Sequence, residues 1–472
     1  IQDFMGNEMS PYEFSFSTDN GDLFKPTLGE IGGEPSTVTP SYSDTPYFPN
    51  KSSHLACQPE AEDNDLWVVN PDNDSVSIFA VTLNPNDFSK THELRREVKL
   101  HFEKPTSVSK VSGLFAVTHA DDDKVAFYNA DGFPQFTIDT GHGTRPIASV
   151  ADGDNLYVSL YGSGEVAKLN VSRKEVSERI YVGATPKAMA LFESRLLVTR
   201  FISTAEQGAV YDVDISGDME LTQTIAINKV LIPDDIVNGS GVPNYLSSIV
   251  ISADGHYAYV TANKANVDRG LLRNGLALDD DNTIRPMMAK IDLLAGTDAN
   301  IDPFTADDTF DFDNSSDPSG ITFLANPDIR VHSLRGNNVV VLTNDARNTA
   351  TQVTTGFAPS EMCTTLRTLY VKNYTDRTVT AIDVASFMHS NHMSPATDTL
   401  HSVTEETLNE QELLGLRTFY HSSKPEMGHD GYMTCASCHA DGGHDGMTWD
   451  ITSLGEGLRN TLSLNGASGT RF

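Results

Sequence analysis

The chain has 472 residues and carries 65 acidic against 33 basic side chains, for a formal net charge of −32. Proteins bind the phosphates of nucleic acids and anionic lipids with Lys and Arg, and a chain this acidic repels them. We therefore expect it to bind neither. Its 39% hydrophobic and 8% aromatic content is that of a globular protein, without the ~20 consecutive apolar residues of a transmembrane helix. The charge suits docking to a basic redox partner, although solubility in a salty medium would also account for it.

Residues 1–58 are rich in Ser, Thr, Pro, Gly and Asp and show little periodicity, so we expect an irregular N-terminal segment there. The sequence begins at Ile1, without a start methionine or an apolar export segment. We interpret it as the mature form of an exported bacterial protein, in the periplasm or outside the cell.

From residue 59 to residue 385 one pattern recurs, in which a short β-branched or aromatic run is followed by a polar turn and a second short run. The runs are 66–70 with 75–79, 114–118 with 124–128, 156–159 with 165–169, 196–199 with 209–212, 257–261 with 289–292, 339–343, and 369–373 with 378–383. Each run has the length and composition of a strand. A four-stranded unit recurring at roughly 40–50 residues predicts a β-propeller, here of about seven blades.

The motif Tyr259-Val260-Thr261-Ala262-Asn263 resembles the consensus of the YVTN family of β-propeller repeats, which implies the same fold. Two stretches, 263–288 and 294–326, break the period and are predicted to be insertions. The second contains Asp298, Asp302, Asp307, Asp308, Asp311, Asp313 and Asp317. Carboxylate oxygens could bind Ca²⁺, but no stretch has the full spacing of a calcium loop, so a solvated acidic loop is the better account.

Four histidines in or near the predicted strands could in principle bind copper, as propeller histidines do in nitrous oxide reductase and thiocyanate dehydrogenase. They are His119, His142, His256 and His332. The blade sequences do not otherwise resemble those enzymes, so we do not expect a copper site. Cys57 and Cys363 flank the repeats, and either a disulfide tying the two ends together or two separate buried thiols would fit.

After residue 385 the strand pattern stops. Asn409-Glu410-Gln411-Glu412 resembles a capped helix start, with Leu413, Leu416 and Tyr420 following on one helical face. We therefore expect a small all-α cytochrome c-like haem domain over 386–472. The predicted fold class is mainly β, with a propeller followed by this helical domain.

Cys435-Ala436-Ser437-Cys438-His439 is a CxxCH sequence. Its two thiols can each form a thioether with one porphyrin, and the adjacent histidine then becomes the proximal iron ligand. A thioredoxin-type pair would require a βαβ setting, and a zinc site a second pair of ligands; the sequence offers neither. The motif therefore predicts one covalent haem c.

The distal iron ligand and the propionate contacts are less well defined by the sequence. Distal candidates near the motif are Met447, Met427, Met433, His421, His429 and His444. An axial methionine would favour electron transfer, whereas an open or histidine-filled position permits other chemistry. Arg417 and Arg459 could neutralise the haem propionates, although pairing with surface carboxylates would suit them equally.

The segments 415–420, 430–434, 440–450 and 457–461, the last containing Arg459-Asn460-Thr461, surround the haem motif. Together they resemble the first haem segment of the di-haem cytochrome c peroxidase and MauG family. Members of that family carry two CxxCH motifs, whereas this sequence contains a single one, at residues 435–439.

The resemblance leaves three functions open. The first is a redox subunit or haem-dependent oxidoreductase, whose propeller docks a substrate or a partner. The second is a truncated MauG-like peroxidase, and the third is a propeller scaffold in an extracellular cytochrome assembly. The sequence sets neither the substrate nor the oligomeric state.

Overall fold

The computed structural model describes residues 46–57, 65–84, 89–235, 238–305, 308–343, 349–385, 395–422 and 429–465. Most of the predicted irregular N-terminal segment therefore lies outside the described residues, as do Asp307 and Met427.

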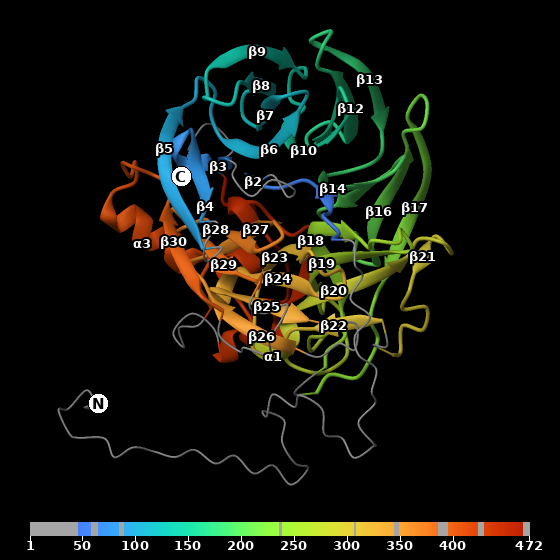
Figure 1. The fold of residues 1–472 in the computed structure, drawn as a ribbon. Coiled ribbons are helices and arrows are strands. Elements are labelled where there is room, and N and C mark those ends of the chain that lie inside the picture. The colour runs from blue at the N-terminus through green and yellow to red at the C-terminus, as the bar shows by residue number, and fades with distance from the viewer. Residues whose placement is uncertain are drawn as a thin grey trace, which may run out of the picture. The chain divides into compact units, whose positions relative to one another are not determined.

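Seven antiparallel sheets form the blades of a β-propeller, and the first four follow one another along the chain (Figure 1). Their strands are β2 (Leu55–Ala56), β3 (Asp65–Asn70), β4 (Ser75–Leu83) and β5 (Lys90–Lys99); β6 (Pro105–Val111), β7 (Leu114–His119), β8 (Lys124–Tyr128) and β9 (Pro134–Asp139); β10 (Pro146–Asp152), β11 (Asn155–Leu160), β12 (Glu165–Asn170) and β13 (Glu175–Tyr181); and β14 (Pro186–Phe192), β15 (Arg195–Arg200), β16 (Gln207–Asp214) and β17 (Glu220–Asn228).

The remaining three blades complete the propeller, so the predicted number of about seven is confirmed. Their strands are β18 (Val242–Ile251), β19 (Tyr257–Ala265), β20 (Ile284–Asp292) and β21 (Thr297–Asp298), with β22 (Thr309–Asp311) also paired to β20; β23 (Pro318–Phe323), β24 (Arg330–Leu334), β25 (Val339–Thr343) and β26 (Thr349–Thr354); and β27 (Pro359–Thr364), β28 (Thr368–Asn373), β29 (Thr378–Asp383) and β30 (Thr397–His401).

The burial of each strand within its blade explains which strands can be recognised in the sequence as apolar runs. The second strand of a blade, such as β11, is buried over nearly its whole length, because neighbouring blades cover both of its faces. The outermost strand, such as β13, alternates exposed and half-buried residues, because one of its faces meets solvent. The apolar runs found in the sequence are therefore the middle strands, and each of them is confirmed.

Five of the innermost strands begin with a proline that follows a residue in the left-handed conformation. These residues are Lys104, Arg145, Thr185, Asp317 and Ala358, with φ between 50° and 55°. Because proline disfavours the right-handed helical conformation in the residue before it, the chain turns sharply into the strand at each of these positions. The repeated turn brings the five residues to the same end of the central channel, which we call the channel mouth.

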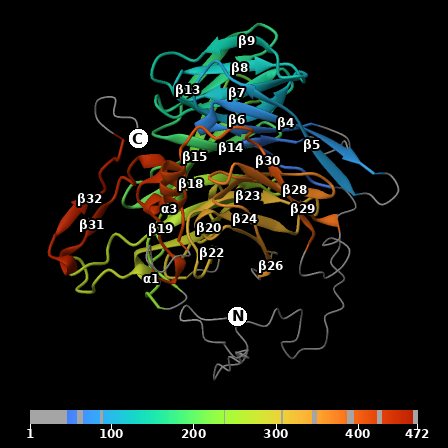
Figure 2. The same cartoon turned by 90° about the vertical axis from the view of Figure 1, so that its left-hand side faces the viewer.

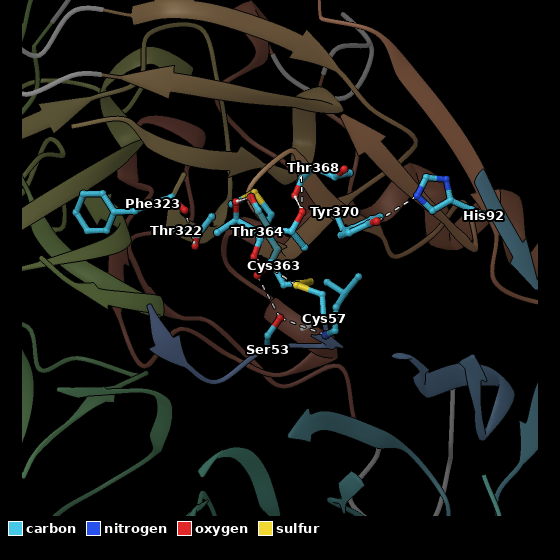
Figure 3. The surroundings of a disulfide bond; sticks show 12 residues. Ser53, Cys57, His92, Thr322, Phe323, Cys363, Thr364, Thr368 and Tyr370 are labelled. Carbon is cyan, nitrogen blue, oxygen red and sulfur yellow. Dashed lines mark hydrogen bonds between the residues drawn. A yellow bond between two sulfur atoms is a disulfide. The ribbon is translucent and has the colours of Figure 1, made fainter. Parts of the chain in front are cut away.

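The first and last blades close the ring without exchanging a strand, since each is built from one stretch of chain. Their innermost strands, β2 and β27, lie in contact. A disulfide joins Cys57, just after β2, to Cys363 on β27 (Figure 3). The structure thus selects the disulfide over two separate thiols, and this bond links the two ends of the repeat region covalently.

The propeller extends past both of the boundaries expected from the sequence. Strand β1 (Asn50–Lys51) pairs with β14, the innermost strand of the fourth blade, before the chain reaches β2 in the first blade. Lys51 forms an ion pair with Glu361 on the innermost strand of the last blade. At the other end, β30 completes the seventh blade at residue 401.

The two predicted insertions lie in and beside the fifth blade. The first covers the end of β19 and the long connection to β20, which includes α1 (Asp280–Thr283). The second contains β21 and β22 but also β23, which is a regular blade strand and not part of an insertion.

The predicted small all-α cytochrome c domain is wrong. After β30 the described residues form the helix α3 (Glu410–Phe419), several 3-10 turns, and a hairpin of β31 (Thr448–Asp450) and β32 (Leu458–Asn460). The helix and its Asn409 capping box are confirmed, but α1 and α3 are the two α-helices among the described residues. No described helix is long and apolar enough to cross a membrane.

The described residues of this C-terminal segment, 402–422 and 429–465, pack on the propeller instead of forming their own core (Figure 2). Trp449 and Met447 are buried in one cluster with Val242, Ala265 and Ile284 of the fifth blade. The stretch 421–446 is rich in Gly, Asp and His and has no helical apolar period, and its described residues 429–446 form short turns.

A buried lysine in the seventh blade makes stability depend on pH. Lys372 on β28 is 2% exposed and donates to the carbonyl of Val69. Burial, together with the nearby Arg377, lowers the pKa of Lys372 to about 7. In the unfolded chain the pKa is about 10.4, so above pH 7 unfolding takes up a proton that the folded lysine has released.

We therefore expect wild type to gain stability relative to Lys372→Met between pH 7 and pH 10, by at most about 1.4 kcal/mol per pH unit. Below pH 7 the difference between the two proteins should be constant. Urea unfolding at pH 6, 8 and 9.5 measures this. The exposed Lys99→Met serves as the control, and an equal pH dependence in both variants would contradict the assignment.

Candidate haem site

The CxxCH motif lies on a short 3-10 turn, Cys435–Ser437, that is fixed to the sixth blade. Thr434 precedes the turn and forms a capping box with Ser437. Both hydroxyl groups donate to the carboxylate of Asp317, with 2.8 Å from Ser437 Oγ to Asp317 Oδ1. The same carboxylate accepts a hydrogen bond from Asn263 Nδ2 at 3.1 Å. One buried side chain of the propeller therefore holds the turn that carries both cysteines.

Replacing Asp317 by Gly should loosen this turn while leaving the propeller folded. Glycine tolerates the left-handed φ of 50° at this position, so the carboxylate is what the variant loses. Two buried hydroxyl groups lose their acceptor, at a cost of roughly 1–3 kcal/mol each. Hydrogen exchange should increase over residues 432–440 and stay unchanged in blades two and three. The exposed Asp218→Gly is the control, and unchanged exchange at 432–440 would show that Asp317 does not anchor the motif.

His439 has the orientation that an iron ligand needs. Its Nδ1 lies 3.2 Å from the carbonyl oxygen of Gly443. A carbonyl only accepts hydrogen bonds, so Nδ1 carries the proton and Nε2 keeps its lone pair for a metal. The backbone beside it is also held, because the Tyr245 hydroxyl donates to the carbonyl of Cys438 at 2.8 Å and accepts from the amide of Ala440 at 3.2 Å.

The two cysteines are not bonded to each other, and Cys435 is exposed while Cys438 is partly buried. Burial, with the nearby carboxylate of Asp445, raises the pKa of the Cys438 thiol. A protonated, half-buried thiol is a poor redox nucleophile. Together with the histidine tautomer, the free thiols fit covalent attachment of haem c, whose iron would take His439 as one axial ligand.

The structure brings two of the candidate distal ligands close to the motif. Met447 is 1% exposed, and Met433 is partly buried in the same cluster, which Cys438 also touches. Both methionines therefore lie beside the attachment point, where they fill space against the fifth blade. Either side chain as distal ligand stays a prediction.

The histidine candidates are placed less favourably. His444 is exposed, and its Nδ1 accepts from the amide of Gly446 at 3.1 Å. The Nδ1 of His421 lies 3.3 Å from the side-chain amide of Asn338 in the sixth blade. In both His444 and His421, Nδ1 accepts a hydrogen bond, so the neutral imidazole carries its proton on Nε2. His429 lies in a 3-10 turn, and its side chain lies outside the described residues.

Both arginines proposed for the propionates already have carboxylate partners. Arg417 pairs with Asp376 at 2.9 Å and lies over the ring of Phe357. Arg459 pairs with Glu456 at 2.9 Å on the exposed hairpin. Their contact with haem propionates stays a prediction.

A second anchor, which the sequence did not reveal, fixes the chain just after the motif. Buried Asp445 accepts 2.8 Å hydrogen bonds from the Trp449 indole and from the amide of Met447. Its own carbonyl accepts from Asn244 Nδ2 of the fifth blade at 2.8 Å. In the sequence, Asp445 is one aspartate in the acidic stretch after the motif, and that position does not predict a buried hydrogen-bond acceptor.

The residues considered for calcium and copper lie in other settings. Asp311 pairs with Lys264, Asp313 accepts from Tyr432, and burial raises the pKa of Asp298 to about 6. His119 and His332 are buried in separate blades, and His142 and His256 are exposed. Within the described ranges no three His, Cys, Asp or Glu side chains are arranged to hold a metal ion. Calcium binding stays a prediction.

No family model and no curated protein matches the chain. Among solved structures it is similar to Kuenenia stuttgartiensis hydrazine synthase, with 18% identity and a TM-score of 0.54 over 76% of this chain and 99% of that one. It is also similar to virginiamycin B lyase from Staphylococcus aureus, with 11% identity and a TM-score of 0.44 over 69% of this chain and 93% of that one. The first likeness shows the propeller fold alone.

Proposed function

We propose that this chain is an exported c-type haem protein that acts in electron transfer, as a redox subunit whose propeller docks the partner or substrate. One haem c is attached through Cys435 and Cys438, with His439 as an axial iron ligand. The observation that carries the proposal is the CxxCH turn held on the channel mouth with the Nδ1 of His439 bonded to the carbonyl of Gly443.

When bound, the haem supplies a one-electron redox centre. The chain's own residues position it: Asp317 holds the turn, Tyr245 holds the backbone on both sides of His439, and Gly443 fixes the imidazole. The net charge of −32 would attract a basic redox partner and speed its association at low salt.

The periplasm or the extracellular space suits both cysteine pairs. A disulfide between Cys57 and Cys363 persists in an oxidising compartment. This disulfide supports our proposal that the protein works in the periplasm or outside the cell.

The test uses protein matured with its haem. We expect a Soret band that shifts reversibly on reduction, and rapid reoxidation by a basic cytochrome that slows as salt is added. The same sample is then given hydrogen peroxide. Turnover of peroxide without electron transfer to the acceptor would contradict the proposal and favour the MauG-like peroxidase.

A further inference from the structure

A loop of the fifth blade exposes three leucines. The connection between β19 and β20 turns back on itself over residues 270–276, where Gly270 and Leu276 form an isolated antiparallel bridge. On this turn Leu271, Leu272 and Leu276 are 45%, 64% and 53% exposed. Single exposed leucines are common on protein surfaces, whereas a group of them marks an interaction site. What decides between the two is whether further apolar side chains lie beside this turn.

The C-terminal hairpin, which projects from the propeller, exposes two more leucines (Figure 2). Leu458 on β32 pairs with Asp450 on β31, and Leu454 lies in the 3-10 turn between the two strands. Their exposed fractions are 48% and 79%. Directly opposed residues of an antiparallel pair point to the same face, so Leu458 lies on the hairpin face that carries the side chain of Asp450.

Asp450 holds the loop against this face of the hairpin. Its buried carboxylate accepts a 2.7 Å hydrogen bond from the amide of Leu272. Arg273 donates to the carbonyl of Thr448 on the same strand at 3.1 Å. Gly270 lies so close that an added Cβ would come within 2.4 Å of the Cβ of Asp450. The loop and the hairpin therefore form one continuous surface. We call its exposed leucines the leucine surface: Leu271, Leu272, Leu276, Leu454 and Leu458.

The same hairpin is bonded to the CxxCH segment. After β32 the chain returns to Gly442, whose carbonyl accepts from the amide of Leu464 at 2.8 Å. The amide of Gly442 donates to the carbonyl of His439 at 2.9 Å. From β31, Trp449 is buried in the cluster that Cys438 also touches. A protein seated on the leucine surface would therefore contact the segment that carries the proposed haem.

The surroundings of the leucine surface are acidic. Residues 266–283 include four acidic and two basic side chains, and residues 440–465 include four acidic and one basic. The three basic residues are arginines that already pair with carboxylates: Arg269 with Asp279 at 2.9 Å, Arg273 with Asp268 at 4.0 Å, and Arg459 with Glu456 at 2.9 Å. A second copy of this chain would bring the same charge of −32 and be repelled, whereas a basic protein would be attracted.

We propose that the leucine surface is the docking site for a basic protein that exchanges electrons with the haem. This inference rests on the proposed function and assigns the surface to which its partner binds. The partner would cover the leucines with an apolar patch ringed by lysine or arginine, as in interfaces with an apolar centre and a polar rim. Apolar contacts at the centre then slow dissociation, and the opposite charges speed association.

The test measures binding of a small basic c-type cytochrome to the matured, haem-carrying protein by surface plasmon resonance. We expect Leu272→Ser and Leu454→Ser each to raise the Kd about tenfold, chiefly through faster dissociation, because each removes one leucine from the interface. Added salt should lower the association rate of wild type and of both variants alike. Leu294→Ser is the matched control. Leu294 is 73% exposed and follows the opposite end of β20, so its replacement should leave the Kd unchanged.

A second arm tests the other possible occupant, a second copy of this chain. Wild type and both leucine variants are compared by analytical ultracentrifugation without the cytochrome, and we expect all three to sediment alike. A wild-type dimer that Leu272→Ser or Leu454→Ser dissociates would show that the leucine surface binds another copy, and would overturn the inference.

The inference also fails, with the proposed function intact, when haem-carrying Leu272→Ser and Leu454→Ser bind and reduce the cytochrome as well as wild type does. An equal loss of affinity in Leu294→Ser would likewise contradict a specific role of the leucine surface. A wild-type protein without Soret absorbance would instead contradict the proposed function and the inference together.

Discussion

Replacing Cys57 and Cys363 by serine lowers the free energy of unfolding by about 2–5 kcal/mol. The disulfide links residues 306 positions apart, and among the described strands none is exchanged between the first and last blades. Without it, the first and last blades close the ring by side-chain packing and hydrogen bonds alone, among them the bond from Lys372 to the carbonyl of Val69. The two serines also remain in a half-buried site lined by Leu55 and Tyr370. Equilibrium unfolding in urea, without reductant, measures the loss.

The control for this prediction is Cys435→Ser/Cys438→Ser in its haem-free form, compared with haem-free wild type. That variant removes two thiols without opening the ring, so its unfolding midpoint should match that of wild type. Equal stability of all three proteins would show that the ring closes without help from the disulfide.

We expect Cys435→Ser/Cys438→Ser to abolish the proposed covalent haem attachment altogether. Each thioether needs a cysteine sulfur, and serine cannot replace it. The turn itself should survive, because its anchors are the hydroxyl groups of Thr434 and Ser437 on Asp317. We expect loss of all haem that stays with the chain after denaturation, with unchanged circular dichroism of the propeller.

The matching variant for this second prediction is Cys57→Ser/Cys363→Ser. It should keep one haem per chain while losing stability, which is the reverse of the effect at the haem motif. Haem retained by the Cys435→Ser/Cys438→Ser chain in denaturant would contradict attachment at these positions.

The blade count was predictable because burial in a propeller leaves a local trace. The middle strands, such as Leu114–His119, are covered on both faces and so are continuous apolar runs. Strands at the two edges of a blade leave weaker traces. The innermost strand β10, Pro146–Asp152, separates its Ile and Val by Ala and Ser, and the outermost strand β5 alternates charged and half-buried positions. The boundaries at residues 58 and 385 missed such strands.

The prediction of a helical haem domain was wrong because the helix signal at Asn409 was extended over the whole C-terminal segment. The capping box at Asn409 and Glu412 does start a helix, and that helix ends at Phe419. Beyond it, the apolar residues Tyr432, Met447 and Trp449 are too widely spaced for a helical core of their own, and they are buried against the propeller. Sequence spacing does not say which surface such residues cover.

The haem motif was visible in the sequence, but the residues that support it were not. CxxCH needs only five adjacent residues. Asp317 lies 120 positions from Ser437, and Tyr245 lies 193 positions from Cys438. Contacts over such separations carry no local pattern.

The most direct test of the account is the intact mass of wild type, matured in an oxidising compartment with the c-type haem apparatus, combined with its pyridine haemochrome spectrum. We predict the mass of the polypeptide plus one haem, and a spectrum of one haem joined by two thioethers. The mass of the bare polypeptide, without Soret absorbance, would contradict the account.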